Sequence, residues 1–172
     1  MKNNYELIKD YSLFDGLNKE EVEKFISLMK FKKVKNEEII MKEGDDGDTI
    51  ILLLSGEVNI TKALTLKNKK TVSDNREKMS VRIDSKKLHY FFGEISFFNE
   101  VDKRTATITA TTNCEIAILD DNDIINLRNE YKDTLIACQN NITKKEFLYL
   151  SNLAKVTEIK ILTSQKKKHE NK

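Results

Sequence analysis

Residues 91–110, FFGEISFFNEVDKRTATITA, combine a glycine, an acid, several apolar residues and, after a short gap, Arg-Thr-Ala. Gly93 can open one helical turn, which directs the backbone N–H groups of the next three residues at a ligand. Arg104 can face the same ligand with a planar cation that carries several donors. The carboxylate of Glu94 repels a phosphate, so it suits a neighbouring sugar hydroxyl instead. This stretch therefore predicts an anion-binding site beside a β-strand.

A second glycine-rich stretch lies upstream, in EGDDGDTIILLLSGEV at residues 43–58. Gly44 and Gly47 lie between two predicted strands, where turn positions with positive φ favour glycine and aspartate. Gly56 separates LLLS from EVNI, which predicts a tight hairpin turn at Ser55-Gly56. We interpret these glycines as turn residues that need no functional role.

The rest of the sequence changes from helical to β periodicity and back again. Residues 18–30 place apolar side chains at helical spacing, with Asn18 as the predicted N-cap and Glu21 at the third helical position. Residues 31–119 are short β-branched runs separated by turn residues, a pattern typical of antiparallel sandwiches and barrels. The runs are FKKV, EEIIM, TIILLLS, EVNITKAL, MSVRI, TATITAT and EIAIL. Helical periodicity then returns, as a short helix followed by a longer one over 131–162.

The composition limits the class of protein. With 30 basic and 28 acidic residues in 172, the chain lacks the basic excess of a dedicated nucleic-acid binder. Its longest apolar run, at 50–54, is far shorter than the ~20 residues of a membrane span, and its start lacks a secretory signal. We therefore expect a cytoplasmic protein with Cys114 and Cys138 as reduced thiols. We expect no metal, no cofactor and no enzymatic activity, because neither metal-ligand spacing nor a nucleophile–base pair is present.

The two glycine-rich stretches at 43–58 and 91–110 resemble motifs of the cyclic-nucleotide-binding domain family. This family occurs in catabolite activator proteins, cyclic-nucleotide-dependent kinases and gated channels. The family's phosphate-binding cassette reads approximately F-G-E-[aliphatic]-A-[apolar]-[apolar], then a variable gap, then R-[S/T/A]-A. This chain has FGEISFF at 92–98 and RTA at 104–106. GDDGD at 44–48, followed by TIILLLSGEV, is similar to a second signature of the family. The resemblance covers about residues 12–150.

The resemblance implies a mainly β fold with flanking helices, in which the strands form an antiparallel β-roll of the double-stranded β-helix or jelly-roll type. It places an N-terminal helix before the roll and long C-terminal helices after it. The expected divisions are a helical segment at 1–30, a β-roll at 31–120 with the cassette at 92–106, C-terminal helices at 121–163 and a disordered Lys-rich tail at 164–172.

The resemblance also implies which residues bind the ligand. Arg104 would pair with the exocyclic oxygens of a cyclic phosphate, and backbone amides on both sides of the gap would complete the cradle. Glu94 and the Gly93 backbone would hold the ribose 2′-hydroxyl, and Thr105 would contact the phosphate and reach toward the base. The implied ligand-binding residues are Gly93, Glu94, Ile95, Ser96, Arg104, Thr105 and Ala106.

Some positions depart from the family pattern. Ser96 replaces the usual alanine, and the glycine that usually precedes F-G-E is missing from KKLHYFFGE. Residues 67–79 make a longer polar hairpin, which we interpret as a disordered insertion, with a partner site as the alternative. His89 invites comparison with the haem sensors of this superfamily. A lone histidine on a strand of alternating pattern is more often structural or solvent-facing.

Further readings stay open. In one alternative, Glu94 and Arg104 serve only to pair with each other. In another, the domain keeps the fold without a ligand, as some relatives do. The apolar positions of the C-terminal segment suit either a homodimeric coiled coil or a helix that packs back on the barrel as a lid.

We therefore expect a sensor that binds cAMP or cGMP, with a lean to cAMP, and that moves its C-terminal helix toward an unknown protein effector. The alternative is a ligand-free interaction module with the same fold. By the resemblance, transcription factors of this family carry a helix-turn-helix domain after the long helix. Because only nine residues follow Thr163, we expect no sequence-specific DNA binding. Titration of specific and scrambled duplexes at physiological salt checks this expectation, which predicts only weak, salt-sensitive binding to either duplex.

Overall fold

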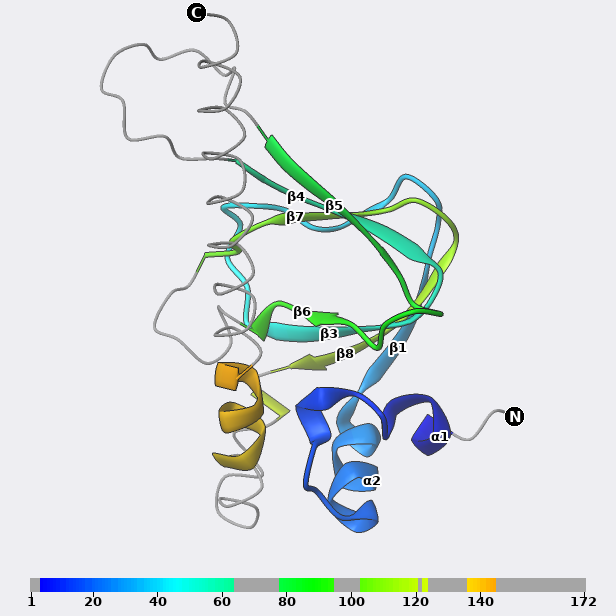
Figure 1. Ribbon diagram of the computed structural model, residues 1–172, viewed down its shortest axis with the longest axis vertical. Helices are drawn as coiled ribbons and strands as arrows, with labels where there is room; N and C mark the ends of the chain where they lie inside the picture. Colours follow the sequence, from blue (N-terminus) through cyan, green and yellow to red (C-terminus); the bar gives the residue numbers. More distant parts are fainter. Residues whose placement is uncertain (1–3, 64–77, 95–102, 121, 124–135, 145–172) are drawn as a thin grey trace, which may run out of the picture.

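The computed structural model describes residues 4–63, 78–94, 103–120, 122–123 and 136–144, and its helices and strands follow the predicted order (Figure 1). A helical N-terminal part precedes eight strands, and residues 136–144 form a further helix. The elements are α1 (Asn4–Ile8), the 3-10 helix η1 (Ser12–Phe14), α2 (Lys19–Leu28), β1 (Lys30–Val34), β2 (Ile39–Met41), β3 (Thr49–Ser55), β4 (Glu57–Ala63), β5 (Lys78–Asp84), β6 (Phe91–Phe92), β7 (Thr107–Ala110) and β8 (Cys114–Asp120).

The strands form two four-stranded antiparallel sheets (Figure 1). The helix-side sheet has the order β1-β8-β3-β6, and the outer sheet has the order β2-β7-β4-β5. The expected antiparallel β-roll with flanking helices is therefore confirmed. The hairpin predicted at Ser55-Gly56 is wrong, because β3 and β4 belong to different sheets. The chain turns a corner there, and Gly56 has a φ of +93° and no room for a Cβ against the Asn113 carbonyl.

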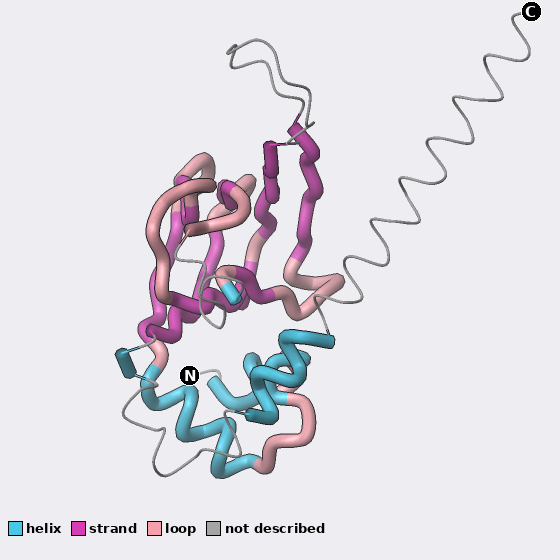
Figure 2. Tube along the Cα trace, turned by 90° about the vertical axis from the view of Figure 1, so that its left-hand side faces the viewer, coloured by secondary structure: helices cyan, strands magenta, loops and turns pink. Residues whose placement is uncertain are grey.

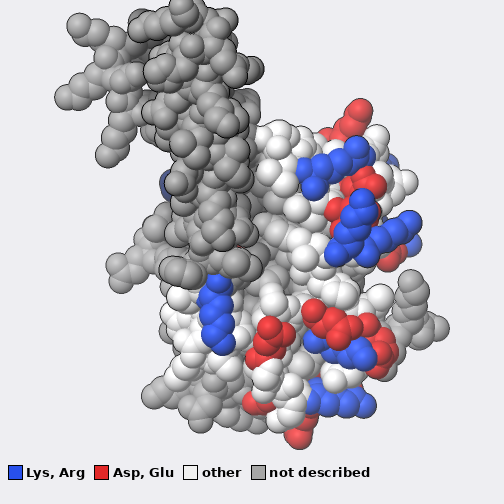
Figure 3. Space-filling model, viewed as in Figure 1, with Lys and Arg blue, Asp and Glu red and all other residues white. Residues whose placement is uncertain are grey.

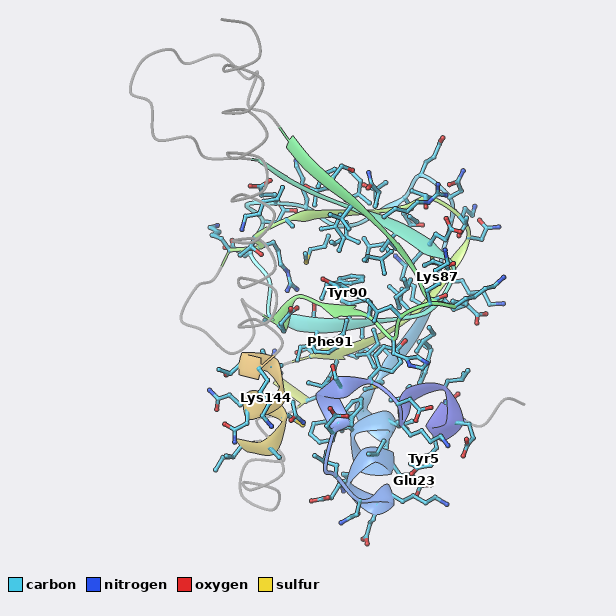
Figure 4. All side chains as sticks on the ribbon, viewed as in Figure 1. Tyr5, Glu23, Lys87, Tyr90, Phe91 and Lys144 are labelled. Carbon is cyan, nitrogen blue, oxygen red and sulfur yellow. The ribbon has the colours of Figure 1, made fainter. Side chains whose placement is uncertain are left out.

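Strand β3 is buried on both faces, which explains its unbroken apolar run. Ile50 and Leu52 belong to a core between the helix-side sheet and the helices, whereas Ile51 and Leu53 belong to a second core between the sheets. The side chains of β6 and its neighbours alternate in the same way. Figure 4 shows Tyr90 and Phe91 on opposite sides of the sheet, toward the roll interior and toward the helices. Strands β3 and β6 therefore link the two cores.

Helix α2 begins with the predicted cap. The Asn18 side chain accepts a hydrogen bond from the Glu21 amide at 3.0 Å, and the Glu21 carboxylate accepts one from the Asn18 amide at 2.8 Å. This reciprocal pair satisfies two amides that the first helical turn leaves without partners. The apolar face then places Val22 and Phe25 in the core beneath the helix-side sheet.

Helix 136–144 packs against the N-terminal helical part (Figures 1 and 2). Cys138 and Ile142 are buried in the same core as α1 and α2. The buried Asn141 amide donates to the carbonyls of Leu13 at 3.2 Å and Asp15 at 2.9 Å. Within the described residues, the C-terminal segment therefore packs back on the N-terminal helices. The coiled coil and the tail expected beyond residue 144 lie outside the described residues.

Both cysteines are free and buried, as expected. Burial raises the pKa of Cys138 to about 12, so its thiol stays protonated and unreactive. On the described part of the face in Figure 3, basic and acidic side chains are interspersed. No helix among the described residues is long and apolar enough to cross a membrane. Of the polar hairpin expected at 67–79, only Lys78 and Met79 are described, and they belong to β5.

Asn141 provides a test of the helix packing. Asn141→Ala removes the donor for two carbonyls at a buried site, so the free energy of unfolding should fall by about 1–3 kcal/mol in urea denaturation. Asn140→Ala is the matched control, because it makes the same change on the exposed face of the same helix and should stay within about 0.5 kcal/mol of wild type. Equal effects of the two substitutions would contradict the packing.

Candidate functional site

The end of β6 lies against the start of β3. The register pairs Phe92 with Ile51, so Gly93 follows opposite Ile50, close to the carbonyl of Thr49. Gly93 has a φ of +90°, and a Cβ there would lie 2.3 Å from the Thr49 carbonyl oxygen. Only glycine fits both the backbone conformation and the space. The predicted Phe-Gly-Glu turn is therefore fixed by the adjacent strand.

The guanidinium of Arg104 lies in the same place and is buried, with 7% of the residue exposed. Its Nη1 donates to the carbonyl oxygens of Thr49 at 2.9 Å and of Gly93 at 3.1 Å. Its Nη2 donates to the Thr49 hydroxyl at 2.6 Å. These bonds hold a cation against the glycine turn, as the sequence predicted, although nothing in the sequence marked Thr49 as its main partner.

The backbone of Arg104 is held by the second glycine-rich stretch. Its amide donates to the Asp45 carbonyl at 2.8 Å, and its carbonyl accepts from the Gly44 amide at 2.9 Å. Lys103 and Asp46 pair alongside, through an antiparallel bridge and a 2.5 Å ion pair. The two motifs recognised in the sequence therefore meet in one structure.

Gly47 has a different role from the predicted one. Its φ is not positive, unlike that of Gly44 at +88°, so no turn conformation requires glycine there. A Cβ at Gly47 would lie 1.9 Å from Nε of Arg104. The glycine is needed because the guanidinium passes directly over its backbone, a contact that turn propensity does not reveal.

Glu94 directly follows the glycine and is also buried, with 8% exposed. Burial lowers the pKa of Arg104, while the negative charges of Asp48 and Glu94 raise it. The site thus combines a desolvated cation with a nearby carboxylate. That charge interaction agrees with the reading in which Glu94 and Arg104 act on each other, and it leaves room for a ligand role for both.

The remaining predicted site residues are described in part. Thr105 and Ala106 are half-buried and lie next to Arg104, in a bend that precedes β7. The run TATITAT predicted a strand from Thr105, but the strand begins at Thr107. Ile95 and Ser96 lie outside the described residues.

His89 is exposed and lies outside β6, so its predicted place on an alternating strand is wrong. Its ring centroid is 5.2 Å from that of Tyr11. The Tyr11 hydroxyl in turn donates to the Leu53 carbonyl at 2.5 Å. These contacts give the histidine a packing role. Within the described ranges, no group of three or more His, Cys, Asp or Glu residues could hold a metal ion.

The sequence model of the cyclic nucleotide-binding domain matches residues 31–131, so the chain belongs to that family. This span contains both glycine-rich stretches and Arg104, and it confirms the resemblance that those motifs indicated. The comparison with curated proteins gives no match.

Solved structures share the fold. The N-terminal domain of a transcriptional regulator from Streptomyces coelicolor A3(2) is 19% identical, with a TM-score of 0.66 over 83% of this chain and 94% of that one. A cyclic nucleotide-binding domain from Methylobacillus flagellatus is 22% identical, with a TM-score of 0.66 over 84% and 76%. The regulatory domain of Toxoplasma gondii PKA, solved with cAMP, is 20% identical, with a TM-score of 0.64 over 84% and 48%.

Gly47 and Gly44 form a matched pair for testing the site. Gly47→Ala should displace the Arg104 guanidinium and weaken cyclic nucleotide binding by about tenfold or more, since 1.4 kcal/mol of lost interaction has that effect. Gly44→Ala has open space around the new Cβ and should mainly lower stability through backbone strain, by about 1–3 kcal/mol. Isothermal titration with cAMP, with urea denaturation of each variant, checks both outcomes. Unchanged binding by Gly47→Ala would contradict the placement of Arg104.

Proposed function

We propose that this chain is a non-enzymatic sensor that binds cAMP or cGMP in the cassette at 92–106. The observation that carries the proposal is the buried Arg104 guanidinium, held by Thr49 and Gly93 beside a glycine turn. Burying a cation is costly, and a bound anion offsets that cost. The membership of the cyclic nucleotide-binding domain family supports a cyclic phosphate as that anion.

The two sides of the site suit the two ends of a ribose cyclic phosphate. Arg104 would bind the exocyclic phosphate oxygens through charge-assisted hydrogen bonds. Glu94, one residue beyond the glycine turn, would accept a hydrogen bond from the ribose 2′-hydroxyl. The amides of Ile95, Ser96 and Ala106 would complete the phosphate contacts. A carboxylate beside a phosphate makes sense only if the ligand also offers a donor, which a ribose does.

The choice between the two nucleotides depends on few contacts. Thr105 is half-buried beside Arg104, where a hydroxyl suits either the guanine amino group or the phosphate. A single neutral hydrogen bond contributes about 0.5–1.5 kcal/mol, or at most about tenfold in affinity. We lean to cAMP, and a preference for cGMP by more than about tenfold in competition titrations would reverse this choice.

We also propose that the ligand acts on helix 136–144. Phe91, two residues before the glycine turn, is buried in the core that also holds Cys138 and Ile142. A ligand that shifts residues 91–94 therefore changes the packing available to the helix. Switching requires that the ligand bind one helix arrangement better than the other. By reciprocity, Asn141→Ala should change nucleotide affinity and Asn140→Ala should not.

The alternative function is a ligand-free interaction module. It is supported by the hydrogen bonds that Arg104 makes to protein oxygens, because they give the residue a structural role without any ligand. Binding of neither nucleotide by the folded wild-type protein at millimolar concentrations would favour this alternative.

Arg104→Lys is the sharper substitution for testing the proposal. Arg104→Ala would leave the Thr49 and Gly93 carbonyls without this donor, so loss of binding and loss of folding would be mixed. Lysine keeps the charge but not the paired planar donors, and truncation of such pairs costs about 2–5 kcal/mol. We expect Arg104→Lys to weaken binding by at least about tenfold, as measured by calorimetry.

Glu94→Gln provides a second arm that keeps the shape of the side chain. It removes a charged acceptor for the 2′-hydroxyl, worth about 1.5–3 kcal/mol, and should weaken cAMP binding by roughly tenfold or more. It should affect 2′-deoxy-cAMP much less, because that ligand lacks the donor. Circular dichroism of each variant controls for folding. If both variants bind as wild type does, the cassette assignment is wrong.

A further inference from the structure

Thr49 makes two different contacts with the Arg104 guanidinium. Its carbonyl oxygen accepts from Nη1 at 2.9 Å, and its hydroxyl oxygen accepts from Nη2 at 2.6 Å. A further bond joins Nη1 to the Gly93 carbonyl at 3.1 Å. The bonds to Nη1 hold one corner of the planar group, whereas the bond to Nη2 holds a second corner. The Thr49 hydroxyl therefore limits rotation of the guanidinium about the corner that the two carbonyls hold.

The fold also fixes where this hydroxyl lies. Thr49 is the first residue of β3 and pairs with Asp120 of β8, so the strand ladder orders its backbone. A β-branched side chain has few favourable χ1 rotamers, which limits the positions that its hydroxyl can take. Because Arg104 is 7% exposed, water has little access to the bond between them. The two carbonyls are present whatever side chains the chain carries, whereas the hydroxyl depends on residue type.

We propose that Thr49 is a positioning residue of the anion site. Its hydroxyl orients the Arg104 guanidinium and thereby selects which exocyclic oxygen of a cyclic phosphate the cation binds. This inference rests on the proposed function, because it concerns how the same site holds its ligand. Thr49 acts through Arg104, so the inference requires no direct contact between Thr49 and the nucleotide.

The orientation of the guanidinium has a consequence for affinity. A side chain that is ordered during folding needs no further ordering when the ligand arrives, which lowers the cost of binding. Without the Thr49 hydroxyl, part of this ordering has to occur during binding. Ordering one flexible side chain at an interface costs up to about tenfold in affinity. The negative charges of Asp48 and Glu94, which act on Arg104, also attract a less restrained guanidinium away from the ligand.

Thr49→Val tests the inference, because valine keeps the β-branched shape and removes the hydroxyl. It should weaken cAMP binding in calorimetry by about two- to tenfold. Thr49→Ser keeps the hydroxyl acceptor and should bind within about twofold of wild type. Thr109→Val is the matched control, at a half-buried threonine of β7 whose neighbours Ile108 and Ala110 are buried in the roll core. Its side chain points away from that core, so this substitution should leave the affinity unchanged.

The choice of phosphate oxygen separates positioning from a general loss of structure. The two diastereomers of the cAMP phosphorothioate carry sulfur, a weak hydrogen-bond acceptor, at one or the other exocyclic position. Wild type should bind them with unequal affinities, because an oriented guanidinium meets the two positions differently. In Thr49→Val the ratio of these two affinities should fall toward one. The ratio between cAMP and 2′-deoxy-cAMP, which reports the ribose side of the site, should stay at the wild-type value.

Three results would overturn the inference and leave cyclic nucleotide binding intact. They are a wild type that binds both diastereomers equally, a Thr49→Val variant that binds cAMP as wild type does, and a Thr49→Val variant that binds more weakly but keeps the wild-type diastereomer ratio. The first of these needs no variant, so it does not depend on how Thr49→Val folds. A wild type that binds neither cAMP nor cGMP would overturn the proposed function and this inference together. Urea denaturation of each variant controls for folding.

Discussion

The burial of one guanidinium group constrains both glycine-rich stretches of the central sequence. Arg104 must reach across Gly47 to the start of β3 and the end of β6, so neither Gly47 nor Gly93 has room for a side chain. Its backbone must also meet the loop at Gly44 and Asp45, which fixes where the segment before β7 lies. Two stretches that are about 50 residues apart in the sequence therefore depend on one side chain.

Strand β3 makes this site part of both cores. Its first residue accepts hydrogen bonds from Arg104, and the following residues alternate between the core beneath the helices and the core inside the roll. Phe91 and Phe92 of β6 divide between the same two cores. Close-packed cores do not deform smoothly, so a displacement at the glycine turn must be absorbed by repacking on one side or the other. In the core beneath the helices, helix 136–144 is also hydrogen-bonded to the N-terminal part, through the Asn141 side chain.

The sequence predicted features that depend on local chemistry and failed where distant contacts decide. The α2 cap and seven of the eight described strands follow from residue type and periodicity and were predicted correctly, whereas the two-residue strand β6 was not among the predicted runs. The corner at Gly56 was mistaken for a hairpin, because a tight turn looks the same whether the next strand pairs with the last or joins another sheet. Gly47 was assigned to a turn because its true constraint, the approach of the Arg104 side chain, comes from a residue 57 positions further along the chain. Local sequence patterns do not reveal such a contact. Thr49 gave no signal, since a threonine at a strand start is ordinary.

The way Arg104 is held has a consequence for how the site can work. Its described hydrogen-bond acceptors are two carbonyls and a hydroxyl, which orient the guanidinium. Burial lowers the pKa of Arg104, and the formal charges of Asp48 and Glu94 act in the opposite direction. An arriving anion therefore finds a cation whose side-chain ordering was completed during folding, and such preorganisation removes one of the usual costs of binding. The described carbonyl and hydroxyl acceptors thus fix the orientation of the guanidinium before an anion arrives.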